Sequence, residues 1–148
     1  IYVSKNNKIK IEKSVTQTLK EEENYGIKNY KTYKEFGERV YKIRENVIQN
    51  IKKLKTKKKQ IIGYGAPAKA TTALNFFGVT NQIDFIIEDN KLKHNKFVPG
   101  VKIPIFSKNK IKKKVKQILV LAWNFFDEIK KNNSNLSENF INIKDLEK

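Results

Sequence analysis

The sequence lacks the side chains from which many metal and redox sites are built. It contains no cysteine and a single histidine, His94. Without cysteine, the chain can form neither disulfide bonds nor thiolate metal sites. One histidine also argues against a histidine-based metal site, because such sites draw on several ligands of this kind. We therefore expect this chain to bind no metal ion.

Methionine and long apolar stretches are also missing. Because the chain has no methionine, we expect it to be a piece of a longer protein. Its longest strongly apolar stretch, 118-ILVLAWNFF-126, is far shorter than the roughly 20 residues that a membrane-spanning helix needs. No charged-then-apolar leader follows Ile1, so we expect no signal peptide. These features predict a cytoplasmic protein with no membrane partner.

Arginine is scarce although the chain is strongly basic. The formal net charge is +17, yet only Arg39 and Arg44 among the 32 basic residues are arginines. Arginine is favoured wherever phosphates or bases are recognised by paired hydrogen bonds. Asparagine and isoleucine are abundant too, which is typical of a sequence with AT-rich codons. We therefore favour a lysine-coated surface over a nucleic-acid interface, and a modest anionic ligand is compatible with either.

The N-terminal part of the chain predicts a short strand followed by a helix. Residues 1–11 alternate weakly and contain a polar turn at 4–8. A helix is expected to begin at Ser14, because Ser14 and Gln17 have the spacing of a capping box. Gly26 is expected to end it.

A long amphipathic helix is predicted next. Thr32 and Glu35 form a second capping box, and the charge run 55–59 marks the end. Apolar residues recur at spacings of three and four, as on a helix face that packs over a sheet. They are Tyr33, Phe36, Val40, Ile43, Val47, Ile51 and Leu54.

After residue 59 the pattern changes to alternating strands and helices. Strands are expected at 60–65, 83–89, 117–122 and 139–143, and helices at 67–77, 107–115 and 124–132. A polar loop over 90–100 and an extended piece at 101–105 lie between them. This alternation favours a parallel sheet with crossover helices. The sequence thus predicts an α/β fold, a Rossmann-like parallel-sheet domain preceded by the long amphipathic helix.

A glycine-rich turn, 63-GYGAPA-68, follows the first strand of this sheet. Gly63 and Gly65 permit a tight turn, and Ala68 is acceptable as the third small residue of a dinucleotide-binding fingerprint. Glu88 ends the next strand, where a ribose-binding acid belongs. Pro67 is irregular in such a turn because it removes an N–H donor. These residues leave open a nucleotide-binding turn and a glycine corner without a ligand.

Several side chains near this turn have two interpretations. Glu88 could accept hydrogen bonds from sugar hydroxyls or pair with a lysine. The positive charge of Lys69 near a helix N-terminus opposes the helix dipole, which favours an anion that binds to both. Lys93 could neutralise a diphosphate. Both lysines could simply be solvated. Trp123 could stack on a base or lie in the core. His94, in a polar loop, is expected to be exposed and not catalytic.

Three ordered blocks carry a family resemblance: 63-GYGAPAKATTALNFFG-78, 88-EDNKLKHNKFVPGVKIPI-105 and 121-LAWNFFDEI-129. They resemble the C-terminal domain of sugar C-methyltransferases, which use S-adenosylmethionine (SAM) to methylate a carbon of a nucleotide-linked deoxysugar. The preceding long helix is similar too, and 1-IYV-3 resembles the last strand of that family's methyltransferase domain. The PG-x-x-IPI and WN elements make the match specific, since a generic Rossmann turn carries neither.

The resemblance implies a Rossmann-like domain that does not bind the methyl donor. It would help to hold a nucleotide-linked sugar against a preceding methyltransferase domain that carries the SAM site and a catalytic histidine. A zinc-binding domain would come before that one. Residues 1–28 would be a remnant of the methyltransferase domain plus a connecting helix, and residues 29–148 the Rossmann-like C-terminal domain. This chain alone would be inactive.

Matched by position, the resemblance implies substrate-binding residues and no catalytic residue in this chain. The substrate-binding set is Gly63, Tyr64, Gly65, Ala66, Lys69, Asn75, Glu88, Asn90, Lys93, Pro99, Gly100, Trp123 and Asn124. Three departures from the family pattern bear on the ligand: Ala70 replaces glycine, Glu88 replaces aspartate, and His94 with Asn95 replaces Gln-Gly. At the last of these, Asn95 must supply the positive φ that glycine tolerates.

Three other classes of protein remain open from the residues. A dinucleotide (NAD) domain of the dehydrogenase type is compatible with the glycine turn and Glu88, but not with the PG-x-x-IPI and WN elements. A basic nucleic-acid binder is compatible with the charge, although the aromatic residues are placed as core residues rather than as stacking platforms. A structural or dimerisation module would rest on the long helix between Tyr33 and Leu54.

Overall fold

The computed structural model describes residues 5, 10–55 and 60–148. The chain forms two compact units, residues 1–40 and 41–148, and the boundary between them falls within one long helix. Most of the strand predicted over residues 1–11 lies outside the described residues, as does the charge run that follows Lys55. The assignment of residues 1–28 to a preceding domain stays a prediction.

The first unit contains α1 (Lys13–Tyr25) and the beginning of α2 (Tyr30–Lys55). α1 begins one residue before Ser14, whose hydroxyl lies 3.5 Å from the Glu12 carboxylate, so the capping box predicted at Ser14 is wrong. Gly26 ends the helix in the left-handed region, at φ 84°, as predicted.

α2 begins two residues before the predicted capping box of Thr32 and Glu35. The Asn29 side chain accepts a hydrogen bond from the Lys31 N–H at 2.9 Å. An asparagine in this position satisfies one of the N–H groups that the first turn leaves unpaired. The long helix is therefore confirmed, but Thr32 lies inside it.

The apolar face predicted for α2 is buried only in the second unit. Val47 and Ile51 are fully buried there, and Ile43 packs against the same core. In the first unit, Tyr33 and Phe36 are 58% and 57% exposed. The sheet belongs to the second unit. Within that unit, the C-terminal half of α2 packs on the sheet, and the first unit has no sheet among its described residues.

The second unit is built on a five-stranded parallel sheet in the order β3-β2-β1-β4-β5. The strands are β1 (Ile62–Tyr64), β2 (Phe85–Ile87), β3 (Ile105–Phe106), β4 (Val115–Val120) and β5 (Ser137–Asn142). This is the order of a Rossmann-like fold, in which the direction of winding reverses between β1 and β4. The predicted α/β class is confirmed.

The segment between β3 and β4 differs from the prediction of a brief helix over 107–115. It forms only the 3₁₀ helix η2 (Lys108–Lys110), and the Ser107 side chain does not cap it. β4 already begins at Val115, which pairs with Ser137 of β5. Sheet pairing with a strand more than 20 residues away therefore decides the conformation here, rather than local helix propensity.

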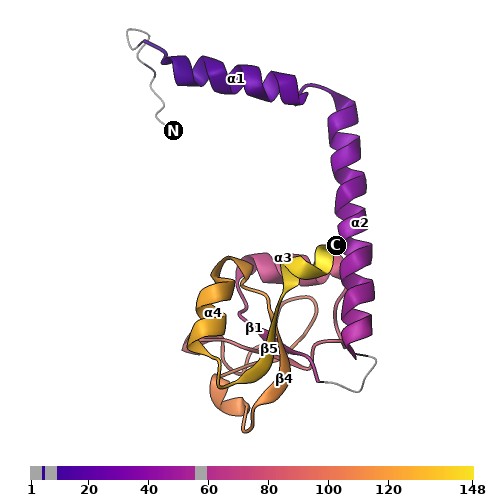
Figure 1. The fold of residues 1–148 in the computed structure, drawn as a ribbon, viewed down its shortest axis with the longest axis vertical. Helices are drawn as coiled ribbons and strands as arrows, with labels where there is room; N and C mark the ends of the chain where they lie inside the picture. The colour runs from indigo at the N-terminus through magenta and orange to yellow at the C-terminus, as the bar shows by residue number, and fades with distance from the viewer. Residues whose placement is uncertain (1–4, 6–9, 56–59) are drawn as a thin grey trace. The chain divides into compact units, whose positions relative to one another are not determined.

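Helices cover both faces of the sheet (Figure 1). On one face, α2 and α3 (Ala68–Phe77) pack over strand residues such as Ile86 and Leu119. On the other face, α4 (Phe126–Asn132) packs over Ile62 and Val120. Since successive strand residues point to opposite faces, strands covered on both sides are apolar throughout.

Candidate functional site

The carboxyl edge of the sheet, at the point where the winding reverses, is where ligands bind in folds of this kind. β1 is followed there by Gly65, β2 by Glu88, and β4 by Leu121 and Ala122. The Leu121 N–H donates to the Tyr64 carbonyl at 2.9 Å, which extends the pairing of β1 and β4 to this edge. The blocks that carry the glycine turn, Glu88 and Trp123 therefore meet, as predicted from the topology.

Two glycines of the turn are required by close packing. A Cβ atom at Gly63 would lie 2.7 Å from the Ile86 side chain, within the core. Gly65 has φ 85°, and a Cβ atom there would lie 2.8 Å from the Ala122 Cβ. Gly65 is therefore fixed both by its left-handed backbone and by the approach of β1 to the segment after β4.

The Glu88 carboxylate fills the inside of the glycine turn. One oxygen accepts a hydrogen bond from the Ala66 N–H at 2.7 Å, and the other accepts one from the Asn90 N–H at 3.0 Å. The Lys93 ammonium lies 3.6 Å from the first oxygen and donates to the Ala66 carbonyl at 2.9 Å. Of the two interpretations of Glu88, the structure shows the pairing with a lysine.

These contacts keep Glu88 ionised. Burial alone would raise the pKa of the Glu88 carboxyl, but hydrogen bonds from the Asn90 and Ala66 backbone and the charge of Lys93 lower it below its ordinary value. The turn therefore contains its own anion. A phosphate at the Ala66 N–H would have to displace this carboxylate, and Pro67 has no N–H to offer instead. The geometry thus disfavours a dinucleotide diphosphate at this turn.

Lys69 and Trp123 form a second contact at the same edge. The Lys69 ammonium lies 4.3 Å from the centroid of the Trp123 ring, within the range of a cation–π interaction. Trp123 is half-buried and packs against the core, whereas Asn124 beside it is exposed. Lys69 is the second residue of α3, so its ammonium stands near a helix N-terminus with unpaired N–H groups.

A third cluster at this edge was not predicted from the sequence. The Tyr64 hydroxyl donates to one oxygen of Asp89 at 2.9 Å, and the Lys108 ammonium lies 2.9 Å from the other. Lys108 also donates to the Asn133 side chain at 2.9 Å. The acidic pair at positions 88 and 89 was the one signal that could have revealed Asp89. Nothing local distinguishes Lys108 from the other lysines.

The charges of this cluster stabilise one another. Burial raises the pKa of the Tyr64 hydroxyl, and the adjacent Asp89 carboxylate adds to that rise. Burial would raise the pKa of Asp89 as well, but its bonds to Lys108 and Tyr64 lower it below the ordinary value. Desolvation opposes the charge of Lys108, yet Asp89 and Tyr64 hold the pKa of Lys108 above its ordinary value. At neutral pH, Asp89 is therefore ionised, Lys108 is protonated and the Tyr64 hydroxyl is neutral.

Asn75, Pro99 and Gly100 lie together, but at the opposite edge of the sheet. The Asn75 side-chain amide donates to the Pro99 carbonyl at 2.9 Å, and a Cβ atom at Gly100 would collide with the Asn75 amide. Asn75 is six residues after Lys69 along α3, about 9 Å away. These contacts fasten a turn onto α3, and the predicted substrate role of the three residues stays a prediction.

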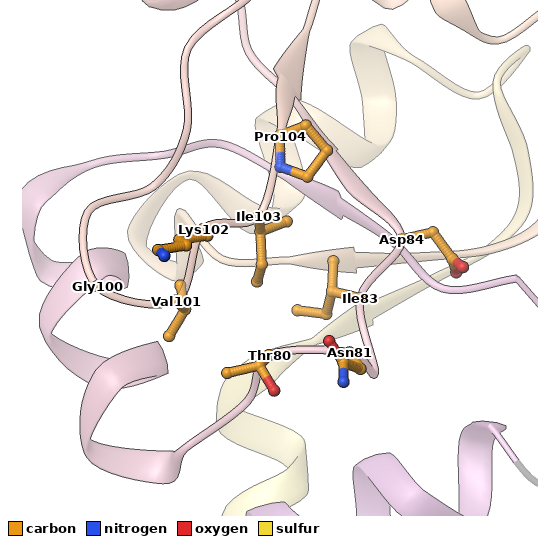
Figure 2. Close-up of a pocket in the computed structure, with 9 residues that line it drawn as sticks. All are labelled: Thr80, Asn81, Ile83, Asp84, Gly100, Val101, Lys102, Ile103 and Pro104. Atoms are coloured by element: carbon orange, nitrogen blue, oxygen red, sulfur yellow. The ribbon is translucent and has the colours of Figure 1, made fainter.

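A cavity of about 490 Å³ adjoins this turn. Figure 2 shows Ile83, Val101 and Ile103 around it, with Thr80 nearby. Ile83 precedes β2 and Ile103 precedes β3, so the cavity opens at the amino ends of these strands. It is therefore separate from the carboxyl edge that carries Glu88 and Lys69.

The loop after β2 is fixed by its own side chains. The Asn90 side chain accepts a hydrogen bond from the Leu92 N–H at 3.0 Å and caps the 3₁₀ helix η1 (Lys91–Lys93). Asn95 has φ 59°, so the prediction that it supplies the positive φ is confirmed. His94 is half-buried, with its Nε2 2.7 Å from the Glu88 carbonyl, and the prediction that it is exposed is wrong.

Comparison with known proteins bears directly on these blocks. The family described as the C-methyltransferase C-terminal domain matches residues 1–142. The chain belongs to this family. It is also 33% identical over 128 residues to the C-methyltransferase NovU of Streptomyces niveus, an alignment that covers 85% of this chain and 30% of NovU. The resemblance inferred from the three blocks is confirmed, and the chain spans less than a third of the length of that relative.

The charged side chains at the carboxyl edge of this C-methyltransferase C-terminal domain differ in whether they are paired. Glu88 and Asp89 are both paired with lysines, and the Tyr64 hydroxyl donates a hydrogen bond to Asp89. Lys69 and the exposed Asn124 are not held by carboxylates in the described part of the chain. These two side chains, with the Trp123 ring, remain available to a ligand.

Within residues 10–55 and 60–148, no group of three or more histidine and acidic side chains is arranged to hold a metal ion. In the same ranges, no helix is both long and apolar enough to cross a membrane.

Proposed function

We propose that this chain is the substrate-binding domain of a SAM-dependent sugar C-methyltransferase and holds a nucleotide-linked sugar. The observation that carries the proposal is the Lys69–Trp123 pair at the carboxyl edge, where a cation, an aromatic ring and the N-terminus of α3 come together. An aromatic ring suits a nucleotide base, and a cation with a helix N-terminus suits its diphosphate. Family membership supplies the reaction class.

The Lys69–Trp123 contact would be exchanged for a contact with the ligand. A cation–π contact near the surface is worth about 0.5–1 kcal/mol. A hydrogen bond to a charged group contributes about 1.5–3 kcal/mol. An arriving diphosphate would therefore draw the Lys69 ammonium off the ring and leave the ring face open for stacking.

Methyl transfer would depend on other domains of the longer enzyme. A preceding methyltransferase domain would bind SAM, and a further domain would hold zinc, neither of which we assign to residues of this chain. NovU, of which the alignment covers 30%, is named a C-methyltransferase, so the remainder of such an enzyme is long enough for both. We propose the preceding domain as the partner of this chain, which would be inactive alone.

Binding can be tested on the 148-residue chain through its single tryptophan, Trp123. We would titrate deoxythymidine diphosphate, guanosine diphosphate and NAD at constant moderate salt and follow Trp123 fluorescence. We expect a nucleoside diphosphate to bind more tightly than NAD. Lys69→Gln should weaken that binding about tenfold, as expected for the loss of one charge-assisted hydrogen bond.

Lys116→Gln is the matched control, because Lys116 is exposed on β4 and away from the carboxyl edge. It should leave the affinity unchanged. Tighter binding of NAD would replace the proposal with the dinucleotide alternative. No binding of any of the three ligands, with a stable oligomer in solution, would leave the structural or dimerisation module.

A further inference from the structure

A second hollow, of about 290 Å³, lies at the carboxyl end of β3 and beside the loop after β2. Phe106, the last residue of β3, forms part of its wall, and Lys110 and Lys112 of the following segment form another part. His94 and Asn95 contribute from the loop after β2. The hollow thus joins two segments of the chain that adjacent strands β2 and β3 bring together.

The wall of this hollow carries positive charge and no negative charge. None of the side chains that line it is acidic. Neither Lys110 nor Lys112 has a carboxylate partner among residues 10–55 and 60–148. Glu88 and Asp89, which precede the loop after β2, are held by Lys93 and Lys108. An anion in the hollow would therefore meet two unneutralised ammonium groups.

The Lys110 ammonium lies over an aromatic ring. It lies 4.7 Å from the centroid of Phe106, in the range of a cation–π contact. Phe106 in turn packs edge-on against Phe85, with the ring centroids 5.7 Å apart and an interplanar angle of 71°. The ring is thus held by the core, and the ammonium above it is more confined than that of an ordinary surface lysine.

Neutral hydrogen-bonding groups complete the lining. Ser107 and Asn109 line the hollow, and the Ser107 hydroxyl makes no capping bond to η2. The His94 ring is oriented by the Glu88 carbonyl, which lies 2.7 Å from Nε2. Because a carbonyl can only accept a hydrogen bond, Nε2 carries the hydrogen. This bond holds the His94 ring in one orientation.

We propose that this hollow binds the phosphate group of a small phosphorylated molecule. Its volume is at the lower limit of ligand pockets, which range over about 300–1,000 Å³, so it suits a phosphate or diphosphate group better than a whole nucleotide sugar. Strands β3 and β1 are two strand spacings apart, about 10 Å, so this site is distinct from the one at Lys69 and Trp123. It does not depend on the ligand proposed there.

The single histidine makes the hollow separately observable. In proton NMR spectra of the 148-residue chain, the ring C–H resonances of His94 belong to one residue, as the Trp123 indole resonance does. We would add inorganic phosphate, a sugar monophosphate or sulfate at constant pH, with chloride adjusted to keep the ionic strength constant. Saturable movement of the His94 resonances, greater for phosphate compounds than for sulfate, is expected.

Variants distinguish this site from a general lysine coat. Lys110→Gln and Lys112→Gln should each weaken phosphate binding at least about fivefold, whereas Lys116→Gln and Lys130→Gln should change it less than about twofold. His94 resonances that shift linearly with added phosphate, without saturation, would overturn the proposal. Equal effects of the four substitutions on phosphate binding would overturn it too. A stronger response to the sugar monophosphate than to inorganic phosphate identifies a phosphate ester as the ligand.

The two sites can fail independently. Suppose that nucleoside diphosphates change the Trp123 fluorescence, and that neither inorganic phosphate nor the sugar monophosphate shifts the His94 resonances. The proposed function then stands and the phosphate site is refuted. If His94 responds and Trp123 does not, the reverse holds. Circular dichroism of each variant establishes that a lost response comes from the side chain and not from unfolding.

Discussion

Glu88 decides what the glycine turn presents to a ligand. In the fingerprint of dinucleotide-binding domains, turn N–H groups face a phosphate and the acid at the next strand end faces a ribose. Here the acid turns back onto the Ala66 N–H, and Lys93 bridges the two. One side chain therefore converts an anion-binding turn into a closed corner, and the available cation lies further on, at Lys69.

Replacing Glu88 with glutamine should reduce stability in a pH-dependent way. The pKa of Glu88 is lower in the folded chain than in the unfolded one, so ionised Glu88 stabilises the fold above the ordinary carboxyl pKa. That contribution is lost as the pH falls through the lower, folded pKa. At neutral pH, Glu88→Gln should cost about 1–3 kcal/mol, and the difference from the wild type should shrink as the pH falls below the ordinary carboxyl pKa.

Urea unfolding at a series of pH values measures this difference. Glu138→Gln is the matched control, because Glu138 is exposed on β5. A difference between wild type and Glu88→Gln that stays constant across the series would show that the charge of Glu88 does not contribute.

At the scale of elements, α2 and α3 have different tasks. α3 joins the two edges of the sheet, with Lys69 near its start and Asn75 near its end. α2 covers the sheet only with its C-terminal half, where Val47 and Ile51 are fully buried. A regular apolar pattern along one helix thus corresponds to a core contact in one stretch and to an exposed surface in another.

Two substitutions in α2 should show this difference. Ile51→Ala should destabilise the second unit by about 2–5 kcal/mol, since it removes buried methyl groups and leaves a cavity. Phe36→Ala, in the same helix but with Phe36 57% exposed, should change stability by no more than about 0.5 kcal/mol. Unfolding followed by Trp123 fluorescence reports on the second unit. Equal effects of the two substitutions would contradict the burial difference within α2.

At the scale of the whole molecule, the net charge of +17 is the dominant property. This value already counts every acid, including Glu88 and Asp89, which pair with Lys93 and Lys108. Lysines spread over a surface attract any polyanion, but without bidentate groups they do so by charge alone. The charge therefore predicts attraction to nucleic acid without selectivity.

Binding to a short DNA duplex should accordingly be lost as salt rises. Between about 50 and 200 mM salt, the affinity should fall at least about a thousandfold, as for a protein that makes six or more phosphate contacts. Fluorescence anisotropy of a labelled duplex measures this. The affinity for a nucleoside diphosphate at Lys69 should fall far less, because the ligand brings fewer phosphate charges than the duplex. DNA affinity that persists at the higher salt would indicate a dedicated nucleic-acid interface.

The sequence predicted the architecture better than the contacts. Alternating strands and helices, the glycine at position 65 and the positive φ of Asn95 follow from local rules of chain geometry. The partner of Glu88 could not be chosen, because a chain with so many lysines offers too many candidates. The Asp89–Lys108 pair joins residues 19 positions apart. Only the alignment of β2 with β3 brings them together, and no periodicity encodes it.

The Glu88 corner also has a consequence for the energetics of ligand binding. Its bonds to Ala66, Asn90 and Lys93 exist without a ligand, so the turn is ordered before anything binds. A ligand that settles beside it loses little affinity to ordering of the loop. The Ala66 amide hydrogen should therefore exchange slowly with deuterated solvent in the unliganded chain, and ligand binding should not slow that exchange much further.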